Sequence, residues 1–449
     1  MPCDGRGGVA APRIVVANGT YAITRRTSFR KLLWTPSSPV VHQGYLYALA
    51  LAQQKTGVQL HHGQLLPTHE HLTVTPTRDN LPDFFRALHR ESARYLQELL
   101  LASGYDAPES VWDKRQTHAM RLVDAGAQAA WMLYAHTNCV AAGLVERVED
   151  YPGFASDLGW LKGGGTAVKK PDLYYGKGGP EEIELLSTPS PLLHRAFDGD
   201  GDAMVYWLRK RARGIEDALR DERRAKGMSV LGAARIRAIH PWSEPRTPRE
   251  RRGEIIPSFR VDGDPEARAA LYKALVAERR GFLGEHAESL ECWRAGDREV
   301  SFPAGTYQMR RLHRANVAPA YPGAILCAPD AVGEIPRPNM DVVSAFVRET
   351  HVEHTAVLTD ITDAAAPVSA AAAEPESENA SPADAAQSAV EEGCADDGGA
   401  EDASARGPRT APTRPPPEAT PLISPGGTAD TEHASRLVTL RNRRDRDPP

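Results

Sequence analysis

Two histidines that flank a glutamate are the first residues in the sequence whose spacing suggests chemistry. His69, Glu70 and His71 lie in the largely apolar stretch LLPTHEHLTV, residues 65–74. Side chains at positions i and i+2 of a β-strand point to the same face of the sheet. Two imidazoles close together on one face can hold a metal ion. The alternative is two polar residues on the solvated side of a strand.

A tyrosine and an asparagine further along the chain are expected to share one face of a helix. The segment AGAQAAWMLYAHTNCVAAG, residues 125–143, has a helical pattern, and Tyr134 and Asn138 are four positions apart in it. Residues at i and i+4 lie one above the other. If this face opposes the two histidines, a phenol, an amide oxygen and two imidazole nitrogens meet. Such ligands can hold Mg²⁺ or Mn²⁺, with water at the open positions.

This set of groups is suited to cleaving a nucleic-acid backbone. A tyrosine hydroxyl, with a pKa of about 10, is a poor nucleophile at neutral pH. A metal ion bound to the scissile phosphate withdraws charge from phosphorus and stabilises the leaving 3′-oxygen. Attack by the tyrosine then gives a covalent phosphotyrosine, and a second 3′-hydroxyl can reverse this step and join strands.

Three segments, in this order, resemble one known family. LLPTHEHLTV is similar to the LMPNHVHLLV-type signature of IS200-like single-tyrosine transposases of the HUH class (Y1 type). The segment YAHTNCVAAGLVERVEDYPGFAS, residues 134–156, resembles a stretch of their REP-associated tyrosine transposase branch that reads roughly YIHxNPVRAGLV. Between them, VWDKRQTHAMRLVD, residues 111–124, resembles the Trp-containing stretch of that branch. The resemblance covers about residues 13–156.

The resemblance implies residue roles, a fold and a substrate. It makes His69 and His71 the metal-binding pair, Asn138 the third metal ligand and Tyr134 the nucleophile. It implies a ferredoxin-like α+β sandwich, Mg²⁺ or Mn²⁺ as cofactor, and single-stranded or hairpin DNA as partner. Relatives differ in oligomeric state, so a homodimer is one expectation. A cytoplasmic, nucleoid-associated location is another.

The sequence departs from the family at two positions. The residue between the histidines is normally apolar and is Glu70 here. Strand alternation places Glu70 on the opposite face, against helices; the alternatives are that it reaches the sheet edge or marks a decayed copy. The usual Asn-Pro is Asn138-Cys139. Losing a proline there should alter the helix end more than the chemistry.

Other residues of suitable type are weighed against structural roles. His61 and His62 precede the pair, but Pro67 interrupts the strand, so contact with the site is the lesser expectation. Tyr95 is a rival nucleophile whose apolar neighbours at helical spacing favour core packing. His136 is expected to point away from Tyr134. His118 either lines the site from its strand or, the favoured alternative, lies at the surface. Arg115 and Arg121 are phosphate contacts or solvated charges, and Asp124 and Glu70 are possible acids or bases without an assigned role.

An α+β arrangement would bring these residues together. Alternation and turn signals predict strands over 13–26, 58–68, 71–77 and 116–124. Helical spacing with Ser, Pro and Gly at the ends predicts helices over 38–57, 81–104 and 125–143. Strands grouped with intervening helices favour a mostly antiparallel sheet with helices on its faces.

The chain divides into four predicted parts. Residues 11–160 form the IS200-like catalytic domain, 161–200 a loop-rich connection, 201–330 a mainly helical accessory domain, and 362–449 a disordered acidic and Pro-rich tail. The arginines of residues 208–241 either face DNA phosphates in a helix pair resembling a helix-turn-helix or form an ordinary charged surface. Residues 295–318 resemble a C-terminal segment of longer REP-associated transposases.

Composition excludes several classes of protein. The 449 residues include five cysteines without CxxC spacing, which argues against a disulfide framework or a thiolate zinc site and fits a reducing cytosol. No signal peptide is visible, and no apolar run approaches the ~18 residues of a membrane span, so no membrane partner is expected. The net charge of −5 conceals an uneven distribution, because the tail is acidic and the middle of the chain is basic. The basic middle suggests a polyanion partner or a solvated charged face.

The leading hypothesis is a transposase that cleaves and rejoins single-stranded or hairpin DNA through a 5′-phosphotyrosine at Tyr134. The alternative is a domesticated DNA-binding protein of the same fold with little or no cleavage. A third hypothesis is a zinc hydrolase built on His69 and His71. It lacks a third His, Asp or Glu at a recognisable spacing.

Overall fold

A computed structural model describes residues 12–173, 178–245, 258–262 and 265–319. These residues all fall within one compact unit, Met1–Ala371. The boundaries predicted at residues 160 and 200 stay predictions, and the predicted tail, 362–449, lies outside the described residues. Among the described helices, none combines the length and the apolar character that crossing a membrane requires.

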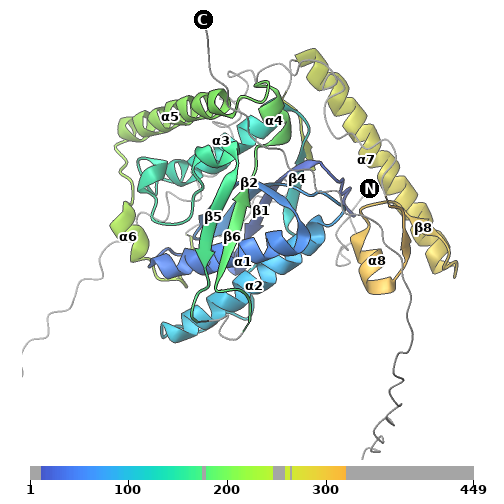
Figure 1. Ribbon diagram of the computed structural model, residues 1–449, viewed down its shortest axis with the longest axis horizontal. Coiled ribbons are helices and arrows are strands. Elements are labelled where there is room, and N and C mark those ends of the chain that lie inside the picture. The colour runs from blue at the N-terminus through green and yellow to red at the C-terminus, as the bar shows by residue number, and fades with distance from the viewer. Residues whose placement is uncertain (1–11, 174–177, 246–257, 263–264, 320–449) are drawn as a thin grey trace, which may run out of the picture. The chain divides into compact units, whose positions relative to one another are not determined.

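A sheet of seven strands forms the centre of the described unit, in the order β5-β6-β2-β3-β1-β4-β7 (Figure 1). Its strands are β1 Thr20–Arg26, β2 Gln59–Leu66, β3 His69–Thr75, β4 His118–Leu122, β5 Gly164–Lys169, β6 Glu182–Ser187 and β7 Phe259–Arg260, and a separate pair is β8 Ser301–Phe302 with β9 Asn316–Val317. Within the group β2-β3-β1-β4, adjacent strands are antiparallel, and these strands follow the chain as β1-α1-β2-β3-α2-β4. This is the order of a ferredoxin-like sandwich, so the predicted α+β fold is confirmed.

Helices cover both faces of the sheet (Figure 1). α1 (Pro39–Thr56) and α2 (Leu81–Ala102) share one hydrophobic core with one face, and α3 (Ala125–Ala141) shares a second core with the other face. α5 (Gly201–Ala225) packs on the outer side of α3. The other helical segments are η1 Ser28–Arg30, η2 Val148–Asp150, η3 Leu158–Lys162, α4 Pro191–Arg195, α6 Ala233–Arg237, α7 Pro265–Arg294 and α8 Tyr307–His313.

The turn between β2 and β3 fixes which residues face one another. A two-residue connection, residues 67–68, joins the strands. Leu66 therefore lies opposite His69, and Gln64 lies opposite His71. Residues opposite each other in an antiparallel pair share a face, so this register decides which β2 side chains accompany the two histidines.

The α1–α2 layer buries the rival tyrosine. Gly44 of α1 allows the Tyr95 ring of α2 to approach closely, because a Cβ at position 44 would lie 2.0 Å from its Cε1. The Tyr95 hydroxyl donates a hydrogen bond to the carbonyl oxygen of Val40 at 2.7 Å. Tyr95 is fully buried, so the expectation that it is a core residue is confirmed.

The segment expected to be a loop-rich connection contributes two strands. β5 and β6 form an antiparallel pair, and β6 continues the sheet beyond β2 through a parallel contact between Leu60 and Ser187. Val168, Ile183 and Leu185 join the α1–α2 core. These strands are short and lie beside glycine-rich stretches, which explains why composition alone favoured a loop.

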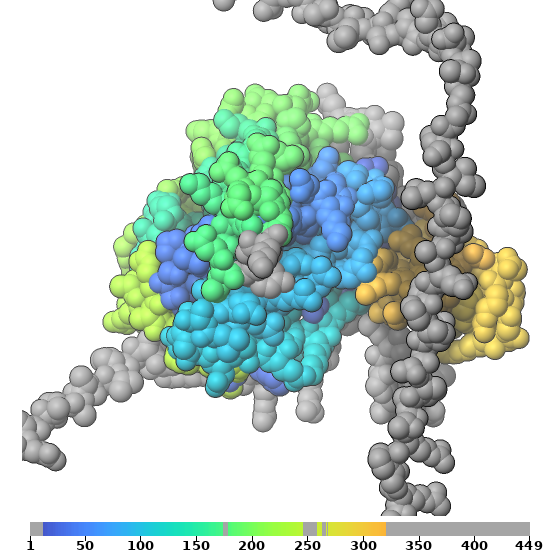
Figure 2. All heavy atoms as spheres, turned by 60° about the horizontal axis from the view of Figure 1, so that its bottom comes forward, coloured from blue at the N-terminus to red at the C-terminus, as the bar shows by residue number. Residues whose placement is uncertain are grey.

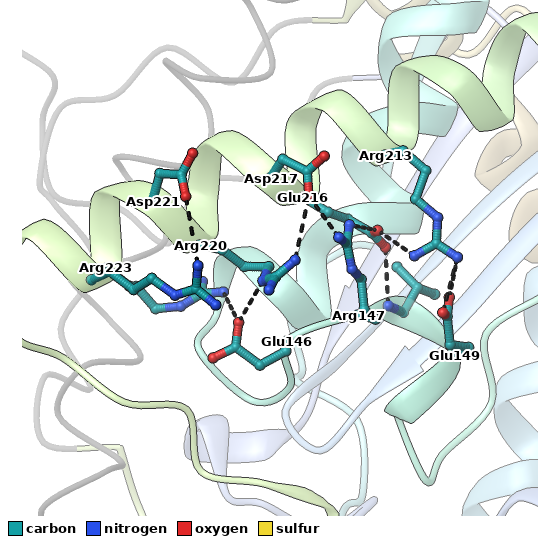
Figure 3. Close-up of polar contacts among 11 residues, drawn as sticks. Glu146, Arg147, Glu149, Arg213, Glu216, Asp217, Arg220, Asp221 and Arg223 are labelled. Carbon is teal, nitrogen blue, oxygen red and sulfur yellow. Dashed lines mark hydrogen bonds and ion pairs between the residues drawn. The ribbon is translucent and has the colours of Figure 1, made fainter.

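An ion-pair network fastens α5 to the segment that follows α3 (Figure 3). Glu216 accepts hydrogen bonds from Arg147 at 2.8 Å and from Arg213 at 3.0 Å. Its other oxygen accepts one from the backbone N–H of Val148 at 3.0 Å. Arg213 also donates to Glu149 at 2.9 Å. Arg213 of α5 and Arg147 of the segment after α3 are therefore both engaged by acidic groups of the same chain.

The helix pair expected within residues 208–241 does not form a helix-turn-helix. α5 is long, but α6, the next helix, has only five residues, Ala233–Arg237. A recognition helix of that motif needs to span a DNA groove. The resemblance to a helix-turn-helix is therefore wrong, and the charges of α5 support its docking on α3.

α7 lies at the β4 edge of the sheet. β7 pairs in parallel with β4, and Leu271 and Leu275 of α7 pack on Val123. Arg121 of β4 forms an ion pair with Glu278 of α7, and both side chains are buried. The expectation that Arg121 contacts phosphates or lies on a solvated face is wrong, because its charge is paired inside the protein.

Candidate functional site

His69 and His71 lie side by side on the face of the sheet that α3 covers. Their ring centroids are 4.6 Å apart, with the ring planes nearly perpendicular. His69 keeps 6% of its accessible surface and His71 keeps 1%. The two rings share a face, as strand alternation requires, but the alternative of a solvated face is wrong.

α3 brings the predicted tyrosine and asparagine to the same place. The Tyr134 ring centroid lies 5.4 Å from that of His71. The Asn138 amide nitrogen, Nδ2, lies 3.3 Å from Nε2 of His71. Trp131, one turn before Tyr134, places its ring 5.4 Å from His71 and 5.2 Å from Tyr134. The four predicted site residues therefore meet, and their chemical roles stay predictions.

Threonine hydroxyls fix the orientation of both imidazoles. Oγ1 of Thr68 lies 2.8 Å from Nδ1 of His69, and Oγ1 of Thr24 lies 3.1 Å from Nδ1 of His71. In metal sites, the ring nitrogen that does not bind the metal usually has a hydrogen-bonding partner that sets the tautomer. The hydroxyls can play that part here and leave Nε2 of each ring as the ligand atom.

The Asn138 side chain provides a test of whether a metal ion fits. Its Oδ1 is buried and has no hydrogen-bonding partner among the described residues. Oxygen and nitrogen of an amide exchange places when the group turns by half a rotation. A buried carbonyl oxygen without a donor is unfavourable, and a metal ion would satisfy it. Two imidazoles and an amide oxygen fit Mg²⁺ or Mn²⁺.

Among the described residues, no carboxylate or thiol joins His69 and His71 to form a set of three metal ligands. In the part of the chain that the structure describes, no group of three or more His, Cys, Asp or Glu side chains is arranged to hold a metal ion. A three-ligand set around His69 and His71 would therefore take its third ligand from another type of group, such as the carboxamide of Asn138.

Glu70 lies on the opposite face of β3, among the helices of the α1–α2 layer. Its Oε2 accepts a hydrogen bond from the Tyr45 hydroxyl at 2.7 Å, and its Oε1 lies 2.5 Å from Nε2 of His89. Burial, together with the adjacent carboxylate, raises the pKa of Tyr45 well above its ordinary value. The expectation that Glu70 packs against helices is confirmed, and the sheet separates it from Tyr134.

A row of polar residues crosses four strands on the α3 face. Gln64, His71, Thr24 and His118 are aligned in register from β2 to β4. Nε2 of Gln64 donates to the carbonyl oxygen of His136 at 3.0 Å, and its Oε1 is buried without a hydrogen-bonding partner among the described residues. Gln64 was not predicted as a site residue, although the two-residue turn after β2 already implied its place opposite His71. His118 is half-buried in this row rather than at the surface.

A second histidine pair lies further along the same interface. Nε2 of His62 is 3.4 Å from Nδ1 of His136, which points away from Tyr134 as expected. Burial lowers the pKa of His136 to about 4 and that of His62 well below its ordinary value. His61 instead contacts Oγ1 of Thr75 at 2.8 Å, and burial lowers its pKa to about 4. These imidazoles are therefore neutral at pH 7.

Asp124 has a structural role at the start of α3, and Arg115 lies at the solvated surface. Asp124 caps α3, because its carboxylate accepts hydrogen bonds from the backbone N–H groups of Ala127 at 2.6 Å and Asp262 at 2.7 Å. Arg115 is exposed and pairs with Asp113 at 3.3 Å. Neither residue belongs to the group around His71.

The site is enclosed. Tyr134 keeps 1% of its accessible surface, and the cavity beside His69 has a volume of only about 10 Å³. Leu144 and Ile239 line this cavity. The segment that contains Ile239 is attached to the end of α3, where the backbone N–H of Leu231 donates to the carbonyl oxygen of Gly143 at 2.9 Å.

Comparisons with solved structures include two that match part of this chain at low TM-scores. No family model and no curated protein matches the chain. A REP-associated tyrosine transposase bound to a REP hairpin is 18% identical with a TM-score of 0.27, over 33% of this chain and 82% of that chain. A candidate transposase from Deinococcus radiodurans R1 is 20% identical with a TM-score of 0.19, over 26% of this chain and 85% of that one. Similarity at this level transfers no activity or residue role.

Proposed function

We propose that this chain is a transposase-like protein that cleaves and rejoins single-stranded or hairpin DNA, with Tyr134 as the nucleophile. One observation carries the proposal: the Tyr134 ring lies 5.4 Å from His71, beside the paired ring of His69 and the amide of Asn138. A phenol beside a possible metal site is the arrangement that tyrosine attack on a phosphodiester needs.

The covalent step balances without an additional reactant. The Tyr134 oxygen forms a bond to phosphorus, the bond from phosphorus to the 3′-oxygen breaks, and the 5′-phosphate remains on the tyrosine. The phenol loses one proton and the departing 3′-oxygen gains one. A second 3′-hydroxyl reverses the step, which releases the tyrosine and joins the strands.

A divalent metal ion is the expected cofactor, held by His69, His71 and Asn138. When bound, it supplies charge neutralisation at the scissile phosphate and stabilises the leaving oxygen. The hydroxyls of Thr24 and Thr68 lie within hydrogen-bonding distance of Nδ1 of the two imidazoles and would leave Nε2 of each ring for the metal ion.

Other contacts at the site hold Tyr134 and its helix in position. Trp131 packs against both Tyr134 and His71 and restricts the rotation of the phenol. Asp124 caps the first turn of α3, which fixes the helix that carries the nucleophile. A reacting group that is held in place needs less reorganisation to reach its attack geometry.

Burial of the site favours a second candidate, a DNA-binding protein of the same fold that does not cleave. Tyr134 is 1% exposed and Asn138 is fully buried. A phosphate reaches these groups only after the residues around the small cavity move. A protein that uses only its surface for DNA needs no such movement.

A covalent adduct distinguishes the two candidates. The full chain would be incubated with hairpin oligonucleotides from the DNA that flanks the gene, labelled at the 3′ end, in Mn²⁺ and then run on a denaturing protein gel. The proposal predicts a labelled band at the mass of the protein, absent in EDTA and in Tyr134→Phe. Tyr95→Phe is the matched control, because this buried tyrosine lies in the α1–α2 core.

Two results of this experiment would contradict the proposal. An adduct that survives Tyr134→Phe overturns the assignment of the nucleophile. DNA binding without an adduct, over several flanking substrates, identifies the non-cleaving DNA-binding protein.

A further inference from the structure

A basic cleft of about 800 Å³ lies on the α1–α2 side of the molecule. Its walls are the end of α1, the loop between β3 and α2, the first turns of α2, and α8. In Figure 2, α8 (orange) adjoins the blue α1–α2 layer. Six cationic side chains line the cleft: Lys55, Arg78, Arg86, Arg90, Arg310 and Arg311.

The two carboxylates of the cleft hold its walls together. Asp79 accepts a hydrogen bond from Arg310 of α8 at 2.7 Å. Asp83, in the first turn of α2, accepts one from the Tyr307 hydroxyl of α8 at 2.5 Å and one from Arg86 at 2.8 Å. The acidic groups are therefore engaged in joining α8 to α2, and they leave the cleft with an excess of positive charge.

Three of the cations are available to a ligand. Lys55, Arg78 and Arg311 are exposed, and none has an acidic partner among the described residues. They come from three different segments, the end of α1, the loop after β3, and α8. Like charges gathered around a hollow repel one another, so a bound anion would relieve this repulsion.

The cleft is separate from the tyrosine site. His69 begins β3 and Thr75 ends it, a separation of roughly 20 Å at the rise of a strand. The cleft lies beyond the Thr75 end, and its α2 wall belongs to the layer that covers the opposite face of the sheet from α3. A ligand in the cleft therefore does not contact Tyr134.

We propose that this cleft binds the phosphate backbone of single-stranded DNA. The α2 wall runs from Asp83 to Arg90, which is about 10 Å of helix, so the cations of the cleft are spread along it. Cations spread along a groove follow a backbone, whereas a site for one phosphate gathers its donors at one point. The charge and shape indicate a phosphate polyanion, and its identity as DNA rests on the proposed function.

Binding without cleavage provides the test. Fluorescence anisotropy would measure the affinity of the full chain for a long oligothymidylate in EDTA, over a series of salt concentrations. Arg78→Glu/Arg311→Glu should weaken binding roughly tenfold or more and lower the salt slope by about 1.4, because each lost phosphate contact on a single strand accounts for about 0.7. Hydrogen exchange of the peptide over residues 78–90 should slow in the wild type when the oligonucleotide is added.

A matched control carries the same change of charge elsewhere. Arg279 and Arg280 are adjacent, exposed arginines of α7. Arg279→Glu/Arg280→Glu should leave affinity and salt slope close to the wild-type values. All four substituted side chains are exposed, and unchanged thermal midpoints would confirm that both double variants fold.

Several results would overturn the proposal. Equal losses in both double variants indicate general charge attraction, and no loss in either indicates that the strand binds elsewhere. Pyrophosphate binding that disappears in Arg78→Glu/Arg311→Glu, while oligonucleotide affinity stays unchanged, identifies a site for small phosphates. Failure of the tyrosine adduct does not affect this test, because the assay contains no metal ion and measures no cleavage.

Discussion

The Asn138 amide lies 3.3 Å from the Nε2 atom of His71, across the interface between α3 and the sheet. In this orientation the amide nitrogen meets the imidazole, and Oδ1 has no hydrogen-bonding partner among the described residues. Turning the amide would bring an oxygen to the same place. Asn138 is thus the residue through which the metal hypothesis is most directly tested.

Two different substitutions of Asn138 should change the affinity for Mn²⁺ in opposite directions. Asn138→Leu should weaken Mn²⁺ binding roughly 10- to 100-fold, as loss of a supporting ligand group does in other metal sites. Asn138→Asp should strengthen it, because a charged oxygen binds Mn²⁺ better than a neutral one. Electron paramagnetic resonance of free Mn²⁺ measures both. Cys139→Ala, a buried neighbour on the same helix, is the control, and equal Mn²⁺ affinity in all variants would exclude Asn138 as a ligand.

Glu70 should affect stability and leave cleavage unchanged. Glu70→Val removes the acceptor of Tyr45 and His89 in the core, which should cost about 1–3 kcal/mol of unfolding free energy for each buried donor left without a partner. Replacing Glu70, Tyr45 and His89 together by apolar residues should recover most of that loss. Urea denaturation measures both variants. Any gain in adduct formation with Glu70→Val would contradict this, because the sheet separates Glu70 from Tyr134.

Stability should fall as the pH is lowered from about 6.5 to about 4. Burial lowers the pKa of His61 and of His136 to about 4, whereas an imidazole in the unfolded chain has a pKa of about 6.5. In this window the unfolded chain binds protons that the folded chain does not, so acid favours unfolding. Across this window each of the two imidazoles should lower the unfolding free energy by on the order of 3 kcal/mol. Above pH 7 neither group makes the unfolding free energy depend on pH.

His61→Gln isolates one of these contributions. It should flatten the pH dependence of the unfolding free energy between pH 4 and 6.5, whatever its effect at neutral pH. His313→Gln changes an exposed side chain of α8 and should leave the slope as it is. A slope that His61→Gln does not alter would show that His61 has the same pKa in the folded and the unfolded chain, which would contradict the effect of burial.

The attachment of α5 should depend on one buried carboxylate. Glu216 is 2% exposed and accepts hydrogen bonds from two arginines and a backbone N–H. Glu216→Ala should cost about 1–3 kcal/mol, because it leaves the buried backbone N–H of Val148 without an acceptor, whereas Arg147 and Arg213 keep access to solvent. Arg224→Ala, in an exposed pair, should cost less than about 0.5 kcal/mol. Comparable losses from the two changes would contradict the structural role of Glu216.

The local parts of the site were predictable from the sequence. Alternation alone put His69 and His71 on one face and Glu70 on the other, and helical spacing put Tyr134 above Asn138. The place of Gln64 opposite His71 follows from the two-residue turn, a signal that was present but not used. These relationships depend on neighbours a few residues apart, where backbone geometry leaves few choices.

The long-range parts were not predictable in the same way. Arg121 is paired with Glu278, which lies more than a hundred residues later in the chain. Arg213 resembles a DNA-binding residue until the structure shows Glu149 and Glu216 beside it. A charged side chain looks the same in a sequence whether it faces phosphate or a distant carboxylate, so only the tertiary contacts decide between these cases.

α3 is buried along its whole length, from Ala125 to Ala141, between the sheet and α5. The residue proposed to attack DNA is therefore carried by an interior helix, and the substrate has to come to it. For a phosphate to reach Tyr134, the residues that line the small cavity beside His69, Leu144 and Ile239 among them, have to move.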